Sequence, residues 1–472
     1  SNTVVTYDTY GRTTSVTENG KTTSYTYNND GSLNTVSENN KTTTYSYSDN
    51  GNLISKTNPD GTVANYSYDN YGNLSGHVYN GYSFSYNTFG NILAANSESS
   101  QLVGFSYSAD TRQNIVNANF GNGQSVNYEY DSDGRISAVK LGNETKYGYS
   151  YQSENGSEEL TEITDYVNNV KKIIEDNKVT VNDLNGNLVY YVTDKEVEGA
   201  SENYTLKTER INGFNYDTKY YENRDSYSSA FSGLTRNLKY NDDGLLSESW
   251  IDLLYVPLCA KAEYDYNHDN SISSITHTLK DISKSYSYSY NDNGNITAES
   301  LTTTSKGEQG ETVESTEIIN YTYDGNNQLL SAETGDKKYS YVYDSRGNIL
   351  GKKKYAVTVD SEGQKSYNEI KNDVYAYDEI WKDKLISYNG QTVSYDASGN
   401  PTNYLGHNLM WTMGRQLSSF DNISYTYDEN GIRASKTVDG ITTKYYLDGT
   451  RLIEQSNGTD TLHFNYDRNG EV

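Results

Sequence analysis

The sequence has one cysteine, three prolines and two methionines among 472 residues, and only 33% of its residues are hydrophobic. The single cysteine, Cys259, excludes an internal disulfide. No run of 18 or more apolar residues is present and no signal peptide is visible, so no membrane insertion is predicted. Low apolar content with a net charge of −26 is typical of disordered chains, and an ordered fold therefore requires another source of buried surface.

The charge of the chain is strongly one-sided. The isoelectric point is near 4.6, which argues against binding to nucleic acids or to anionic membrane surfaces. Acidic and basic residues are nevertheless interspersed along the sequence. This pattern predicts a solvated, self-repelling surface.

Tyrosine is the residue that the chain has in abundance, with 50 copies. The stretch from Tyr341 to Ile349 reads Y-x-Y-D-x-x-G-N-I, and versions of it recur from end to end. The step from Tyr27 to Tyr47 is 20 residues and the step from Tyr47 to Tyr68 is 21. A fixed period of this size predicts a repeat architecture. We take the repeat tyrosines as Tyr25, Tyr27, Tyr45, Tyr47, Tyr66, Tyr68, Tyr341, Tyr343, Tyr425 and Tyr427. We take the turn glycines as Gly31, Gly51, Gly72, Gly134, Gly294, Gly347 and Gly431.

Each period has the composition of one β-hairpin. In residues 21–27, Tyr25 and Tyr27 alternate with Ser and Thr, which predicts a strand with one tyrosine-rich face. Tyrosine buries a large ring and keeps its hydroxyl available for a hydrogen bond, so it supplies the missing buried surface. The residues 28–31 provide turn chemistry, and a type I turn followed by a left-handed glycine predicts a hairpin with a bulge. The chain is therefore predicted to be a long antiparallel meander.

This motif resembles the YD repeat of the RHS/YD-repeat family, which includes bacterial RHS and wall-associated proteins, the C components of insecticidal toxin complexes and animal teneurins. The resemblance covers nearly the whole chain. It implies an all-β fold, a YD-repeat array of antiparallel hairpins that spirals into a large, hollow β-shell. In the family such a shell often encloses a C-terminal toxic domain and is followed by a core whose aspartates release the toxin. Residues 469–472 resemble the lead-in to that core, so no residue here is assigned to self-cleavage.

We predict one continuous repeat domain over residues 1–472, since repeat units contact mainly their neighbours. Residues 1–150 are regular, 151–237 are degenerate and 238–472 contain insertions. The sequence begins in the middle of a repeat, so we expect a fragment of a longer protein.

The degenerate region allows two interpretations. Leu160, Ile163, Val167, Val170 and Ile174 have a spacing that fits an amphipathic helix or two strands joined near residue 168. Their β-branched content favours strands. Residues 216–229 are polar and aromatic, and we expect a longer surface loop there.

Three further segments depart from the regular repeat. Residues 301–320 and 352–372 are polar insertions that predict extended hairpins or mobile loops. Residues 250–260 form the most apolar segment, and we expect them to line a buried seam, with a hydrophobic contact for a partner as the alternative. Trp411 occupies the place of a repeat tyrosine.

No residue pattern indicates catalysis, a cofactor or a metal. The five histidines have no metal-ligand spacing and are expected as strand or turn residues, namely His77, His268, His277, His407 and His463. Residues 131–134 and 242–244 begin like calcium loops but lack the remaining carboxylates.

Two functions remain open at this stage. The first is a non-enzymatic scaffold of a secreted or surface-attached bacterial protein, which encloses or presents a C-terminal effector. The second is a carbohydrate- or cell-surface-binding module that uses exposed tyrosine ladders, a role that the resemblance also implies.

Overall fold

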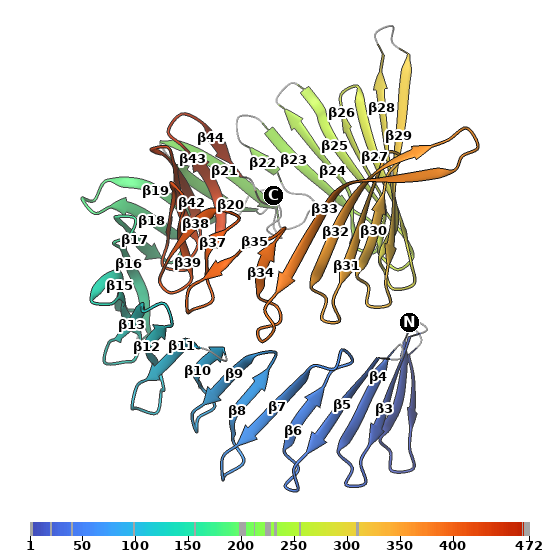
Figure 1. Ribbon diagram of the computed structural model, residues 1–472. Helices are drawn as coiled ribbons and strands as arrows, with labels where there is room; N and C mark the ends of the chain where they lie inside the picture. The colour runs from blue at the N-terminus through green and yellow to red at the C-terminus, as the bar shows by residue number, and fades with distance from the viewer. Residues whose placement is uncertain are drawn as a thin grey trace. The chain divides into compact units, whose positions relative to one another are not determined.

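The structure is a computed structural model that describes residues 3–18, 21–38, 41–97, 100–154, 157–197, 204–211, 213–221, 228–230, 234–253, 256–307, 311–464 and 466. Every regular element in these residues is a β-strand, and neighbouring strands pair in antiparallel ladders such as β1–β2, β28–β29 and β42–β43. No helix long and apolar enough to cross a membrane occurs in them. The prediction of an all-β antiparallel array is confirmed, and Figure 1 shows the succession of hairpins.

The chain divides into two compact units. The first comprises Ser1–Glu144, Asp344–Asn348 and Tyr375–Asp421. Its strands are β1 (Thr3–Tyr7), β2 (Thr13–Glu18), β3 (Lys21–Tyr27), β4 (Leu33–Glu38), β5 (Lys41–Tyr47), β6 (Leu53–Thr57), β7 (Val63–Tyr68), β8 (Leu74–Tyr79), β9 (Tyr82–Tyr86), β10 (Ile92–Ser97), β11 (Ser100–Tyr107), β12 (Ile115–Phe120), β13 (Ser125–Tyr130), β14 (Ile136–Leu141), β34 (Leu385–Tyr388), β35 (Gln391–Thr392), β36 (Ser394–Tyr395), β37 (Pro401–Tyr404), β38 (His407–Thr412) and β39 (Gln416–Phe420).

The second unit comprises Thr145–Tyr343, Ile349–Val374 and Asn422–Val472. Its strands are β15 (Glu144–Glu154), β16 (Ser157–Asp165), β17 (Val170–Glu175), β18 (Lys178–Asp183), β19 (Leu188–Val197), β20 (Tyr204–Ile211), β21 (Phe214–Tyr221), β22 (Ser228–Ala230), β23 (Leu234–Tyr240), β24 (Leu246–Leu253), β25 (Val256–Tyr266), β26 (Ile272–Leu279), β27 (Ile282–Tyr290), β28 (Ile296–Lys306), β29 (Thr312–Tyr323), β30 (Leu329–Glu333), β31 (Lys337–Tyr343), β32 (Ile349–Val359), most of β33 (Lys365–Tyr377), β40 (Ile423–Tyr427), β41 (Arg433–Val438), β42 (Ile441–Asp448), β43 (Arg451–Ser456) and β44 (Thr461–His463).

The repeat turn has the bulged geometry that its residues predict. At the β5–β6 turn, the Gly51 amide donates to the Ser48 carbonyl at 2.9 Å and the Ser48 amide donates to the Asn52 carbonyl at 2.8 Å. The register between the two strands shifts next to Tyr47, as expected for one extra residue. The turn glycines all have positive φ, with values of 92° at Gly31, 81° at Gly51, 85° at Gly72, 81° at Gly134, 80° at Gly294, 95° at Gly347 and 75° at Gly431.

The acidic residue of the motif holds this turn together. Asp69 Oδ1 accepts hydrogen bonds from the backbone amides of Tyr71 and Asn73, both at 2.8 Å. The side-chain bond from Asn73 and these backbone bonds lower the pKa of the Asp69 carboxyl. Asp344 accepts the same two bonds in its own turn. The aspartate is thus a turn cap, which explains its place after the second tyrosine, and Asn291 caps its own turn in the same way.

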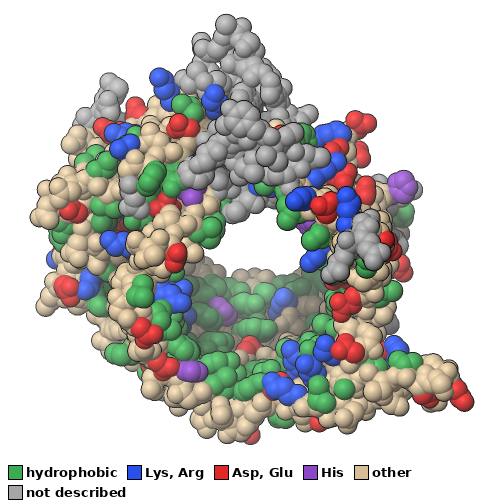
Figure 2. Space-filling view, turned by 90° about the horizontal axis from the view of Figure 1, so that it is seen from above, with side chains coloured by type: hydrophobic (Ala, Val, Ile, Leu, Met, Phe, Trp, Pro, Cys, Tyr) green, Lys and Arg blue, Asp and Glu red, His purple; other side chains and the backbone are tan. Residues whose placement is uncertain are grey.

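Burial alternates along the regular strands, so one face packs and the other is solvated. In β3 and β5 the tyrosines are half-buried, whereas the intervening Ser and Thr residues are exposed. Tyr25, Tyr45 and Tyr66 all lie on the half-buried face. On the surface, Lys and Arg side chains are interspersed with Asp and Glu (Figure 2), as the sequence predicts.

The degenerate region is β-structure. Leu160 and Ile163 lie in β16 and Ile174 lies in β17, and the two strands are joined by a turn in which Asn169 has a φ of 56°. The strand interpretation is therefore confirmed. The expectation of a surface loop over residues 216–229 is wrong for its first part, because residues 216–221 pair with β20 as part of β21. The rest of it lies partly outside the described residues.

The two insertions extend hairpins, since β28–β29 and β32–β33 are ladders of 9 paired positions each. In the apolar segment, Trp250 and Ile251 are half-buried in β24, whereas the side chains of residues 253–259 lie outside the described set. Whether this segment lines a seam stays a prediction, as does the single-domain organisation over residues 1–472.

Candidate functional site

In many repeats the second tyrosine makes a bond that crosses from one hairpin to the previous one. Tyr68 Oη donates to the Leu53 carbonyl at 2.8 Å. The ladder between β6 and β7 ends at the pair of Ser55 and Asn65, so Leu53 lies beyond it and its carbonyl lacks a ladder partner there. The tyrosine hydroxyl thus continues the connection between hairpins where the backbone ladder ends.

The same bond recurs throughout both units, with oxygen–oxygen distances of 2.6–2.9 Å. The donors are Tyr27, Tyr107, Tyr130, Tyr266, Tyr290, Tyr323, Tyr343, Tyr395 and Tyr466. Trp411 Nε1 donates to the Pro401 carbonyl at 2.7 Å. Trp411 therefore substitutes for the repeat tyrosine, as its place in the sequence indicates.

Aromatic side chains also form columns across the strands. His77 of β8 lies opposite Tyr66 of β7 and Phe84 of β9, and its ring stacks on theirs with centroid distances of 6.0 and 4.5 Å. Tyr86 Oη bonds His77 Nδ1 at 2.9 Å, and burial lowers the pKa of the imidazole. His77 is therefore a packing residue within a column.

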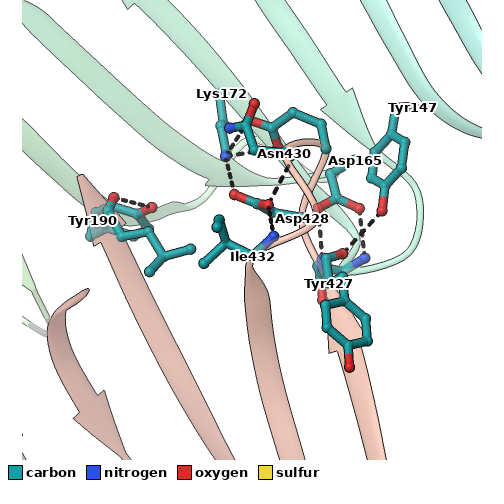
Figure 3. Close-up of polar contacts among 11 residues, drawn as sticks. Tyr147, Asp165, Lys172, Tyr190, Tyr427, Asp428, Asn430 and Ile432 are labelled. Carbon is teal, nitrogen blue, oxygen red and sulfur yellow. Dashed lines mark hydrogen bonds and ion pairs between the residues drawn. The ribbon is translucent and has the colours of Figure 1, made fainter. Parts of the chain in front are cut away.

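One repeat turn, the Tyr427 turn (residues 427–432), is enclosed by a distant part of the second unit (Figure 3). Asn168 Nδ2 and Tyr147 Oη donate to the Tyr427 carbonyl at 2.8 and 3.1 Å. Asp165, which is 1% exposed, fixes Asn168 by accepting its backbone amide at 2.9 Å and its side-chain amide at 2.6 Å. The β16–β17 turn therefore recognises the backbone of a turn that lies about 260 residues later in the chain.

A buried ion pair completes this contact. Lys172 Nζ lies 2.6 Å from Glu429 Oε1 and 3.5 Å from Asp428 Oδ2. The side chain of Lys172 is 14% exposed and those of both carboxylates are 4% exposed. Removing one partner of such a pair leaves an uncompensated buried charge, which is strongly destabilising. We call Asp165, Asn168, Lys172 and the Tyr427 turn the turn lock.

The environment of the turn lock shifts several pKa values upward. Burial raises the pKa of Asp165, although its bonds to Asn168 oppose the shift. Burial, with added repulsion from Asp165, Asp428 and Glu429, also raises the pKa of Tyr147. The Tyr147 hydroxyl is therefore a neutral donor at physiological pH.

A cavity of about 440 Å³ lies beside the turn lock. Its lining includes Val181, Tyr190, Tyr446 and Leu447, and the Tyr190 and Tyr446 rings meet edge to face at 5.4 Å. Tyr190 Oη donates to the Leu447 carbonyl at 3.0 Å. The cavity therefore adjoins the apolar core that joins β18–β20 to β42 and β43.

A second charged cluster surrounds His463 at the end of β44. His463 Nε2 is 3.3 Å from Glu209 Oε2, and Nδ1 is 3.7 Å from Glu454 Oε2. The ring stacks on Tyr216 with a centroid distance of 3.6 Å. Lys207 pairs with Asp448 in the same region. This cluster could not be predicted from the sequence, because its members are separated by up to about 250 residues and follow no motif.

The remaining candidate residues do not converge. Asp131 caps its own turn and pairs with Arg135 at 2.6 Å, and His407 Nδ1 lies 2.7 Å from Asp421. Within the described ranges, no group of three or more His, Cys, Asp or Glu side chains is arranged to hold a metal ion.

Comparisons with known proteins match the repeat and the fold. The family model described as RHS Repeat matches residues 47–83. The chain is 30% identical over 134 residues to the tRNA3(Ser)-specific nuclease WapA of Bacillus spizizenii and 29% identical to the tRNA nuclease WapA of Bacillus subtilis. Each match covers 27% of this chain and 5% of the relative, so the chain spans a small part of both proteins.

Crystal structures of TcdB2-TccC3 have a similar fold. One matches 96% of this chain and 28% of its own with a TM-score of 0.58 at 14% identity. Another, TcdB2-TccC3 without the hypervariable C-terminal region, matches 97% of this chain and 29% of its own with a TM-score of 0.51 at 14% identity. At this identity the likeness concerns the fold alone, and it extends over nearly the whole chain.

Proposed function

We propose that this chain, which belongs to the RHS/YD-repeat family, is the structural β-scaffold of a secreted or surface-attached bacterial protein, and that it encloses or presents a C-terminal effector. The all-β repeat fold supports the scaffold role. Enclosure, secretion and the presence of an effector each require a test of their own.

The observation that carries the proposal is the use of the repeat's polar groups. The second tyrosine of the motif donates its hydroxyl to a backbone carbonyl of the previous hairpin. The aspartate carboxylate accepts hydrogen bonds from the backbone amides of its own turn. Groups that are already bonded within the fold are poor candidates for a ligand or a substrate, since binding would have to break those bonds. The motif therefore serves the construction of the sheet.

The relatives support a separate effector region. The matched part is 5% of the WapA nucleases and 27–29% of the TcdB2-TccC3 chains. Most of each relative thus lies outside the part that resembles this chain, and one solved form is described as lacking a hypervariable C-terminal region. We infer that any activity resides in such a region, with no catalytic, cofactor-binding or metal-binding role for the repeats.

Enclosure can be tested by attaching a cargo to either end. A small, protease-sensitive helical domain is fused after Val472 in one variant and before Ser1 in the other. If the scaffold encloses its C-terminal partner, the C-terminal cargo resists proteolysis and the N-terminal cargo is cleaved. Equal cleavage of both cargoes would contradict enclosure. The scaffold would then only present its C-terminal effector on the outside.

Solution scattering provides an independent test of a hollow shell. A filled chain of this length has an expected radius of gyration of about 23 Å. A shell of equal mass places more of its atoms far from the centre, so we expect a larger value. A radius of gyration at the filled-chain value would contradict the shell.

The carbohydrate alternative requires ring faces that are open to solvent. Tyr25, Tyr45 and Tyr66 are half-buried, and this favours packing over sugar stacking. Binding of glycans through the tyrosine ladders stays a prediction, and a glycan array with the Tyr66→Ala variant as its control would test it.

A further inference from the structure

One long strand has an outer edge that no neighbouring strand covers. β29 pairs with β28 from Thr312 to Asn320, but it pairs with β30 only from Asn320 to Tyr323. Among the described residues, no strand pairs with the other edge of Thr312–Ile319. All residues from Thr312 to Ile318 are exposed, including Val313 at 47% and Ile318 at 50%.

This outer edge, Thr312–Ile319, has the properties of a strand-pairing site. It contains no proline and no lysine, and its register with β28 has no bulge, so three common protections of edge strands are missing. Eight residues span about 27 Å, enough for a substantial ladder. The partner strand β28 is half-buried along nearly its whole length because β27 covers its other side, so the edge is held on a stable support.

The charge of the outer edge selects its partner. Residues 311–319 contain Glu311, Glu314 and Glu317 and no basic residue. Asp336 raises the pKa of the nearby Lys337, and Glu317 adds to the shift, so this carboxylate already acts on a cation of the adjacent hairpin. Two copies of the edge would bring like charges together, which disfavours self-association through it.

We propose that the outer edge of β29 binds an extended, basic peptide segment of a partner protein, which adds to the sheet as an antiparallel strand. Backbone hydrogen bonds supply the affinity in this mode of recognition, and side chains supply the specificity. Because Glu314 and Glu317 are an odd number of residues apart, they lie on opposite faces of the strand. The segment therefore carries two lysine or arginine residues three positions apart, one for each face.

The test uses a fluorescein-labelled octapeptide of threonine and valine with two lysines three positions apart. Fluorescence anisotropy with the full chain measures its affinity. We expect the same peptide with N-methylated alternate amides to bind at least about tenfold more weakly, since it keeps the charges but cannot form the ladder. A peptide of equal composition with lysines two positions apart, both on one face, also binds more weakly.

Variants of the protein locate the site. The double variant Glu314→Lys/Glu317→Lys should weaken binding at least about tenfold, with an unchanged circular dichroism spectrum. Glu369→Lys is the matched control, because β33 is also exposed from Lys365 to Asn372 but carries Lys365 and Lys371 on its own segment. This control should leave binding unchanged.

Hydrogen exchange gives a readout that charge alone does not produce. We expect the peptide to slow exchange of amides in Thr312–Ile319 and to leave Lys365–Asn372 unaffected. Equal binding of the N-methylated peptide would identify simple charge attraction and overturn the proposal. Undiminished binding to the double variant, or a protein dimer formed through this edge, would overturn it as well.

Discussion

The regular repeats and the degenerate region reach a folded state by different means. In β3 and β5, no side chain is fully buried, and the hairpins are joined by half-buried tyrosines and turn caps. In β18–β20, Val181 is 1% exposed and Ile211 is 0% exposed. The degenerate strands pack against β42 and β43, which lie more than 200 residues later. Where the motif is lost, contacts between distant segments add to the ladders between neighbouring strands.

The two regions also differ in their ion pairs. In the regular repeats, Lys140 pairs with Glu129, whose side chain is 51% exposed. In the turn lock, Lys172 pairs with carboxylates that are 4% exposed. Exposed pairs contribute little to stability, whereas breaking a buried pair is costly. The two regions should therefore respond differently to matched substitutions.

The largest effect is expected for Lys172→Met. This change leaves Asp428 and Glu429 buried without their cation and should lower the free energy of unfolding by about 3–5 kcal/mol. Lys140→Met, the matched change in the regular repeats, should lower it by at most about 1 kcal/mol. Urea melts followed by tyrosine fluorescence measure both. Recovery of stability in Lys172→Met/Glu429→Gln would identify the unpaired carboxylate as the cause.

A core truncation should show the second contrast. Ile211→Ala opens a cavity in the buried cluster and should cost about 2–5 kcal/mol. Val36 in β4 is only half-buried, so Val36→Ala should cost much less. Calorimetry of both variants checks the difference. If the two losses were equal, burial in the cluster around Ile211 could not be the reason for the stability of the degenerate region.

Turn glycines should matter through backbone conformation. No atom lies within 4 Å of a Cβ added at Gly51, so Gly51→Val tests the positive φ of 81° alone. We expect a loss of about 1–3 kcal/mol. Gly325→Val is the control, because Gly325 also lies in a repeat turn with open space, while Asn327 takes the left-handed position there with a φ of 63°. A similar loss in the control would disprove the assignment.

The inter-hairpin hydroxyl should contribute less. Tyr68→Phe removes the bond to the Leu53 carbonyl and should cost about 0.5–1.5 kcal/mol. The Tyr66 hydroxyl makes no hydrogen bond within the described residues. Tyr66→Phe should therefore leave the free energy of unfolding almost unchanged. Equal losses in denaturant melts would show that the bond between hairpins adds nothing.

The smallest expected effect concerns acid. Burial raises the pKa of Asp448, but its bond to Lys207 and the charges of Lys207 and Arg451 outweigh this, so the pKa lies below its ordinary value of 3.8. A carboxyl whose pKa is lowered by folding adds stability that is present above its unfolded pKa and is lost as pH falls through the folded pKa. Unfolding free energies measured between pH 5 and about pH 2 should therefore fall less steeply in Lys207→Met. An unchanged slope would rule out this pair as a source of acid sensitivity.

Much of the fold could be predicted from the sequence, because the repeat is a local device. The spacing of Tyr25 and Tyr27 defines a strand face, and Asp69 and Gly72 define a turn, all within a few residues. The partner of each tyrosine hydroxyl lies one hairpin away, and no residue type marks a backbone carbonyl as its acceptor. That bond therefore could not be predicted from the sequence.

The turn lock could not be predicted for a different reason. Asp165, Lys172 and Glu429 are three charged residues among more than a hundred, and nothing in their local sequence selects one another. Asp428 looks like any other turn cap in the motif, and only its low exposure of 3% distinguishes it. Contacts of this kind depend on how a long meander folds back, and that information is not local.

Native-state hydrogen exchange of the Lys172→Met variant tests this account most directly. If the turn lock joins distant segments into one cooperative unit, protection should fall together in β17 and in β40–β43, while β3–β6 keep the rates of the unmodified chain. The same result would show that β3–β6 are stabilised independently of the turn lock. Loss of protection confined to β17, or spread equally into β3–β6, would contradict the distinction between the two regions.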